Sequence, residues 1–81
     1  MKEIKVLLNN VAIIKKFVDI VCKFDMDVDI VYGRYIIDAK SIMGLFSIDT
    51  SHPVIVRFHS DNENVLKNAI EMINALGVII D

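Results

Sequence analysis

The sequence predicts a small α+β domain in which helices cover one face of a mostly antiparallel sheet. Two amphipathic helical segments, one near each end of the chain, supply the helical layer. Short runs rich in Val and Ile, two of them joined through a glycine, supply the sheet. The chain has 81 residues and no internal repeat or linker. Residues 1–81 are therefore expected to form a single domain around one hydrophobic core.

The first half of this pattern begins with a strand. Residues 2–8 alternate apolar and polar side chains, and Asn9 and Asn10 end the run. Residues 11–24 then predict a helix, because apolar side chains recur every three or four residues. That stripe consists of Ile13, Ile14, Phe17, Val18, Val21 and Phe24.

The middle of the chain predicts a hairpin and a short helix. Residues 28–32 and 35–38 are β-rich runs on either side of Gly33, which supplies the positive φ that a tight turn needs. Residues 41–46 are long enough for a short helix. Residues 53–58 are a Val/Ile-rich strand that starts at a proline, a position where proline is tolerated.

The last helix has the clearest boundaries. Ser60 and Glu63 fit a capping box at its start, and Gly77 suits its C-terminal cap. Residues 78–81 are left without an assignment. The buried stripe of this helix is predicted to consist of Val65, Leu66, Ala69, Ile70, Ile73 and Leu76.

Composition excludes several classes of function. Nine basic and eleven acidic residues give a net charge of −2, which favours neither nucleic acid nor a membrane surface as a ligand. No apolar run approaches the roughly 20 residues that span a bilayer. A single cysteine and the absence of a secretory signal predict a cytoplasmic protein. Because 54% of the residues are hydrophobic, we expect a well-filled core and some apolar surface for a protein partner.

The segment Lys40-Ser41-Ile42-Met43-Gly44 is the most informative motif. A serine at a helix start caps free backbone N–H groups, and the helix dipole there favours negative charge. The segment resembles the second helix of HPr, the histidine phosphocarrier of the bacterial phosphoenolpyruvate-dependent sugar phosphotransferase system, especially its Gram-positive form. The resemblance covers nearly the whole chain. It implies an open-faced β-sandwich of order β-α-β-β-α-β-α, with a four-stranded antiparallel sheet, three helices on one face and the first strand beside the last.

The same resemblance implies a site that this chain has lost. In the family, the phosphorylated histidine begins the first helix and is followed closely by an arginine and a proline. An ungapped alignment anchored at Phe17 and Ser41 puts Asn10, Ala12 and Ile13 at those three positions. An amide nitrogen is not a nucleophile, and alanine offers no guanidinium for phosphoryl oxygens. We therefore expect no phosphotransfer through this site, and Asn10 to act as a helix cap only.

In Gram-positive family members a dedicated ATP-dependent kinase phosphorylates the serine that matches Ser41. The resemblance thus implies Ser41 as a regulatory phosphosite. Lys40 beside it favours a dianion, whereas Asp38 opposes one. A simple capping role for Ser41 is the equally weighted alternative.

Members of the family dock partner proteins on the surface formed by these two helix starts. The resemblance therefore implies an apolar docking patch in this chain, made of Val11, Ile42, Met43 and Phe46. If these side chains are exposed together they bind protein, and Met43 suits several partners. The alternative is that Ile13, Met43 and Phe46 turn inward and fill the core, and Phe46 is the one most strongly expected to be buried. A homodimer joined through Val11, Ile42 and Met43 is a further alternative.

The two histidines are weaker candidates. His52 lies in the loop before Pro53, which an antiparallel pairing of the first and last strands would bring near Asn10, so a displaced phosphoacceptor there is an alternative. A solvated loop histidine is the favoured interpretation of His52. His59 is expected to face solvent or to pack beside the last helix.

The remaining polar residues predict no cofactor and no metal. Asp25, Asp27 and Asp29 alternate and share one face, which is more often a solvated edge than a metal site. Cys22 is expected to be a small buried hydrophobic residue. Together these observations predict a protein that is not an enzyme and that binds phosphotransferase-system or regulatory proteins.

Overall fold

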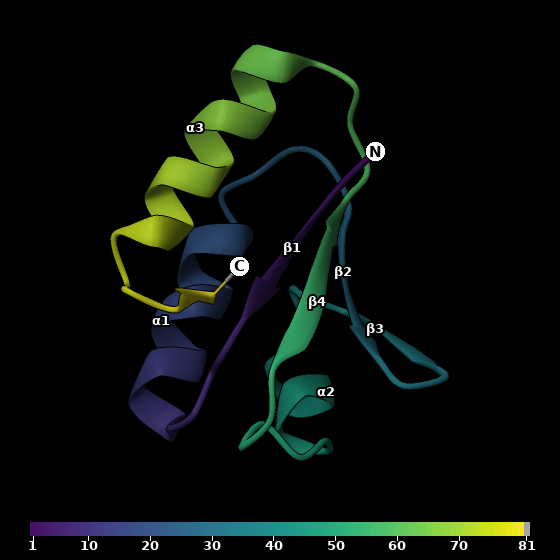
Figure 1. The fold of residues 1–81 in the computed structure, drawn as a ribbon, viewed down its shortest axis with the longest axis vertical. Helices are drawn as coiled ribbons and strands as arrows, with labels where there is room; N and C mark the ends of the chain where they lie inside the picture. Colours follow the sequence, from purple (N-terminus) through teal and green to yellow (C-terminus); the bar gives the residue numbers. More distant parts are fainter. Residues whose placement is uncertain (81) are drawn as a thin grey trace.

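The computed structural model describes residues 1–80 and contains five strands and three helices. Figure 1 shows their arrangement. In chain order the elements are β1 (Lys2–Val6), α1 (Val11–Val21), β2 (Val28–Tyr32), β3 (Tyr35–Asp38), α2 (Ile42–Phe46), β4 (Val54–Phe58), α3 (Glu63–Asn74) and β5 (Ile79–Ile80).

The strands form one antiparallel sheet of order β3-β2-β4-β1-β5. The predicted neighbourhood of the first strand and β4 is confirmed, with Ile4 opposite Val56. The prediction of four strands is wrong, because residues 79 and 80 add the short strand β5 beside β1. The backbone N–H of Leu7 extends this pairing by donating to the carbonyl of Val78 at 2.9 Å. Within the unassigned tail, residues 79 and 80 thus form a strand, and Asp81 lies outside the described residues.

All three helices pack on the same face of the sheet, as predicted. Every second residue of the central strands points toward them, because side chains alternate along a strand. The helices are amphipathic, so their apolar stripes close this layer and leave the other sheet face open. The core consists of Val6, Leu8, Ile14, Phe17, Val18, Val21, Val28, Ile30, Ala39, Leu45, Val54, Val56, Phe58, Ala69, Ile73 and Val78.

The hairpin between β2 and β3 turns at Gly33, whose φ of 58° is the positive value expected there. Helix α1 ends at Val21, before the predicted end at Phe24. Cys22 follows as its C-terminal cap and is exposed, so the prediction of a buried cysteine is wrong. The prediction rested on the usual burial of cysteine, whereas Cys22 lies at the exposed C-terminal end of α1.

The start of α3 also differs from the prediction. Its cap is Asn62, whose side-chain oxygen accepts from the N–H groups of Asn64 (3.0 Å) and Val65 (3.2 Å). Ser60 instead accepts from the N–H of Asn62 at 3.1 Å. Val65, expected in the buried stripe, lies in the first turn of α3 and is 43% exposed.

Candidate functional site

The start of α1 is closed by its own cap. Asn10 has an extended backbone, and its Oδ1 accepts a hydrogen bond from the N–H of Ile13 at 2.9 Å. Its carbonyl accepts from the N–H of Ile14 at 3.0 Å. The predicted capping role of Asn10 is confirmed. The first turn carries no charged side chain, because Val11, Ala12 and Ile13 follow the cap.

Helix α2 begins in the same manner. Oγ of Ser41 accepts from the N–H of Gly44 at 3.2 Å, so Ser41 is the cap that the sequence predicts. The ammonium of Lys40 donates to the carbonyl of Phe24 at 2.8 Å. This hydrogen bond joins the loop that follows α1 to the residue before the cap of α2. It also directs the Lys40 charge toward Phe24, so Lys40 serves the fold in addition to any interaction with Ser41.

Three of the four predicted docking residues are exposed. Val11 is 56% exposed, Met43 73% and Phe46 41%, whereas Ile42 packs partly against the core. The expectation that Phe46 is buried is wrong, because Leu45 is the residue by which α2 enters the core. Helices α1 and α2 are in contact. Val11, at the start of α1, and Ile42, Met43 and Phe46, on α2, are here called the docking patch.

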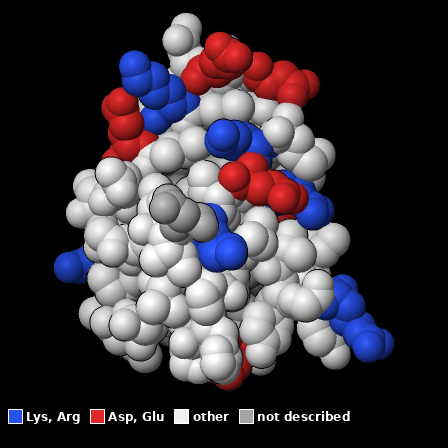
Figure 2. Space-filling model, in the orientation of Figure 1, with Lys and Arg blue, Asp and Glu red and all other residues white. Residues whose placement is uncertain are grey.

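Few charged side chains are visible in Figure 2 at the end of the molecule where α2 and the start of α1 lie. The first turn of α1 and helix α2 both lie at the lower end of the molecule in Figure 1. Figure 2, in the same orientation, shows Lys, Arg, Asp and Glu gathered mainly at the opposite, upper end.

The two histidines lie in different surroundings. His52 is 74% exposed, and its Nε2 lies 3.7 Å from Oδ2 of Asp49 in the same loop. His59 directly follows β4, and its Nε2 lies 2.6 Å from Oδ2 of Asp29 on β2. The first of the two expectations for His59 is confirmed, because the residue is exposed, and it is also paired with Asp29 of the neighbouring strand.

Sequence reasoning missed the group that His59 completes. Asp27, Asp29 and Asp38 line a hollow of about 350 Å³ together with His59, here called the acidic hollow. The alternation of Asp27 and Asp29 predicted that they share a face of the sheet. It could not predict that Asp38 lies beside them, because only the strand register places Asp38 opposite Asp29. Among residues 1–80, no group of three His, Cys, Asp or Glu side chains could hold a metal ion.

Comparison with known proteins identifies the family. The family model described as "PTS HPr component phosphorylation site" matches residues 11–77, which is most of the chain. The chain belongs to the HPr family. It is thus related to the phosphocarriers of the sugar phosphotransferase system, and the sequence-based resemblance is confirmed.

A solved structure supports the HPr fold independently. The crystal structure of HPr-C-His from Thermoanaerobacter tengcongensis has 24% sequence identity to this chain and a TM-score of 0.71. The match covers 94% of each chain. No curated protein matches the sequence. Within the described part of the chain, no helix has the length and hydropathy of a membrane span.

Proposed function

We propose that this HPr-family protein binds proteins of the phosphotransferase system, or regulators linked to it, without carrying phosphate on a histidine of α1. The observation that carries the proposal is the cap at Asn10, whose Oδ1 accepts from the N–H of Ile13 at 2.9 Å. An amide in this position stabilises the helix start and offers no nucleophilic nitrogen. Ala12 next to it provides no cation for a phosphoryl group. The protein would act in the bacterial cytoplasm as a binding module rather than as an enzyme.

The docking patch is the proposed partner surface. Its exposed side chains are apolar, and one of them, Val11, directly follows Asn10, where the family's reacting histidine would be. Met43 is the most exposed of them at 73%, and its flexible thioether adapts to partners of different shape. We expect Met43→Glu to weaken binding to enzyme I or to a sugar-permease phosphoacceptor domain by at least about tenfold, because it places a charge in an apolar contact. Val65→Glu, at a 43% exposed apolar position on α3, is the matched control.

A phosphotransfer assay tests the loss of carrier function. The protein is incubated with enzyme I and labelled phosphoenolpyruvate, with an HPr that has the histidine as the positive control. We expect no acid-labile label on the protein. In Asn10→His/Ala12→Arg, label should appear, since the fold and the helix start remain. Label on the unchanged protein would contradict the proposal.

The displaced phosphoacceptor is tested in the same assay. His52 is accessible, and Asp49 at 3.7 Å can orient its imidazole ring, which is the observation that favours this alternative. Acid-labile label that is lost in His52→Ala would establish it. Label that is lost in His59→Ala would instead identify His59, at the other end of β4, as the phosphoacceptor.

Regulatory phosphorylation is proposed at Ser41. Its Oγ caps α2, so a phosphoryl group there would lie at the helix start, where negative charge is favoured. Incubation with ATP and the kinase that phosphorylates HPr on serine, followed by mass spectrometry, tests this. We expect one acid-stable phosphate that is absent in Ser41→Ala. An unmodified protein beside a fully modified control HPr would leave Ser41 as a cap only.

A homodimer through Val11, Ile42 and Met43 is the remaining alternative for the docking patch. Sedimentation equilibrium distinguishes it from the module that binds other proteins. A dimer that Met43→Glu dissociates would establish self-association, whereas a monomer at all accessible concentrations would leave the patch free for other proteins.

A further inference from the structure

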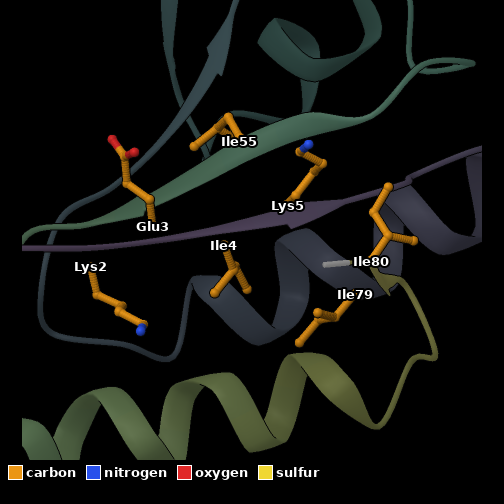
Figure 3. A pocket seen from close by; sticks show the side chains of 7 residues that line it. All are labelled: Lys2, Glu3, Ile4, Lys5, Ile55, Ile79 and Ile80. Atoms are coloured by element: carbon orange, nitrogen blue, oxygen red, sulfur yellow. The ribbon is translucent and has the colours of Figure 1, made fainter.

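The sheet face that no helix covers has an ordered pattern of side chains. Figure 3 shows Glu3, Lys5 and Ile55 on the side away from α1 and α3, whereas Lys2 and Ile4 point toward the helices. The strand register extends this open face across the whole sheet. Its residues in the described chain are Glu3, Lys5, Asp29, Val31, Ile36, Asp38, Ile55, Arg57 and Ile80.

One row across the open face is mostly aliphatic. Val31 lies opposite both Ile36 and Ile55, and Lys5 lies opposite both Ile55 and Ile80. Ile36 is 60% exposed and Ile80 37%, while Val31 and Ile55 are half-buried. These four apolar side chains, here called the aliphatic row, are interrupted only by Lys5, whose stem can lie along apolar surface.

The neighbouring row is acidic. Asp29 lies opposite Asp38 on one side and Arg57 on the other, and Arg57 lies opposite Glu3. Nε of Arg57 donates to Oε2 of Glu3 at 2.7 Å, so this cation is already paired. The carboxylates of the acidic hollow continue the negative surface beyond the row. The open face therefore combines an apolar stripe with unbalanced negative charge along one side.

We propose that the open face binds a cationic amphipathic helix of a partner protein. Apolar residues of that helix would pack on the aliphatic row. Its Lys or Arg side chains would pair with the carboxylates of the acidic hollow, including Asp38. The charge on the face selects this occupant. Glu3 is paired with Arg57, and Asp29 lies 2.6 Å from Nε2 of His59, but within residues 1–80 no ion pair involves Asp27 or Asp38. With Lys5 as the only other cation on the face, negative charge is in excess, so an anionic membrane, nucleic acid or a second copy of the same face is repelled.

The dimensions of the open face also suit a helix. Strands lie about 4.8 Å apart, so a row across the five strands extends roughly 19 Å. About 13 helical residues at 1.5 Å rise cover that length. The aliphatic and acidic rows are two residues apart along each strand, roughly 7 Å, which is within the width of one helix. This surface is separate from the docking patch, so the proposal does not depend on the proposed function.

The test uses the whole ¹⁵N-labelled protein and a synthetic helical peptide of roughly 14 residues composed of lysine and leucine. We expect amide shift changes centred on Val31, Ile36 and Ile55, with affinity that falls as salt is added. A glutamate and leucine peptide of the same pattern should not bind. Vesicles containing phosphatidylserine should not bind either. Shift changes centred on α3 or the docking patch, or no binding of the cationic peptide, would overturn the proposal.

Two substitutions on exposed side chains separate the apolar and charged contributions. Ile36→Ser should weaken binding roughly tenfold, and Asp38→Asn roughly twofold to fivefold. The asparagine oxygen can still accept from the N–H of Lys40, which Asp38 binds at 2.9 Å. The matched controls are Val65→Ser on α3 and Asp19→Asn on α1, both exposed and away from the open face. Equal affinity for all four variants would contradict the proposal.

Discussion

At the scale of single residues, Asn10 has a structural role at the start of α1. Its side-chain oxygen accepts from the N–H of Ile13 and satisfies one of the free donors of the first turn. Ser41 does the same for α2 through Gly44. Both helix starts of the proposed docking region are thus stabilised by short polar side chains.

The cap at Asn10 has a measurable effect on stability. We expect Asn10→Ala to lower the free energy of unfolding by about 1 kcal/mol, because the N–H of Ile13 loses its acceptor. Asn10→Asp should retain the cap and most of the stability. Urea unfolding followed by circular dichroism measures the difference. Asn9→Ala is the matched control, and an equal loss in both alanine variants would show that the cap is not the cause.

Asp49 provides a residue-scale test by pH. The Ser51 hydroxyl and backbone N–H donate to Asp49, and with nearby His52 they lower the pKa of the Asp49 carboxyl. A lowered pKa in the folded state favours folding above the ordinary aspartate range, and this contribution is lost as the pH falls through the lowered pKa. In Ser51→Ala the pKa of Asp49 should rise, while Ser51→Thr should keep it low. Carboxyl ¹³C titration by NMR measures both.

At the scale of elements, the local sequence pattern predicted which segments form helices and strands. It did not always predict which side chains of those elements are buried. The stripe of α1 was predicted because an eleven-residue helix presents a complete apolar face. In the five-residue helix α2, spacing could not distinguish Leu45, which enters the core, from Phe46, which does not. Before α3, Ser60 and Asn62 are both residue types that cap helices well. Which of them is the cap depends on where the chain turns after β4, and in the structure the cap is Asn62.

The contact between α2 and β3 requires a glycine at position 44. A Cβ on Gly44 would lie 2.7 Å from Cγ2 of Ile37. Alanine favours a helix over glycine by about 1 kcal/mol, but crowding of this kind costs about 1–3 kcal/mol. We therefore expect Gly44→Ala to destabilise the protein by about 1 kcal/mol.

A double-mutant cycle with Ile37→Ala isolates that contact. Ile37→Ala removes the clashing methyl, so adding Gly44→Ala to it should cost much less than in the unchanged protein, or even stabilise α2. Thermal unfolding of the four proteins gives the coupling. If the effects of the two substitutions on stability are additive, the contact with Ile37 is not the reason why alanine at position 44 destabilises the protein.

At the scale of the whole molecule, the strand order lay beyond what pattern reasoning could give. Alternation indicates which face of a strand is buried but not its neighbour, so the pairing of β1 with β4 was expected from the HPr resemblance alone. Strand β5 was missed because two residues cannot show a period. The acidic hollow was missed for the same reason as the strand order, since β2, β3 and the residue after β4 meet only in the folded sheet.

The fifth strand closes one end of the core, which gives a prediction for the whole molecule. Val78 is 5% exposed, and its carbonyl accepts from the N–H of Leu7, whereas Ile80 is 37% exposed. Val78→Ala removes two buried methyl groups and should cost about 2 kcal/mol in urea unfolding. Ile80→Ala, on the open face, should cost clearly less. Equal losses would mean that the tail contributes through its exposed side rather than through the core. A loss at Val78 alone would establish that segment as part of the folded domain.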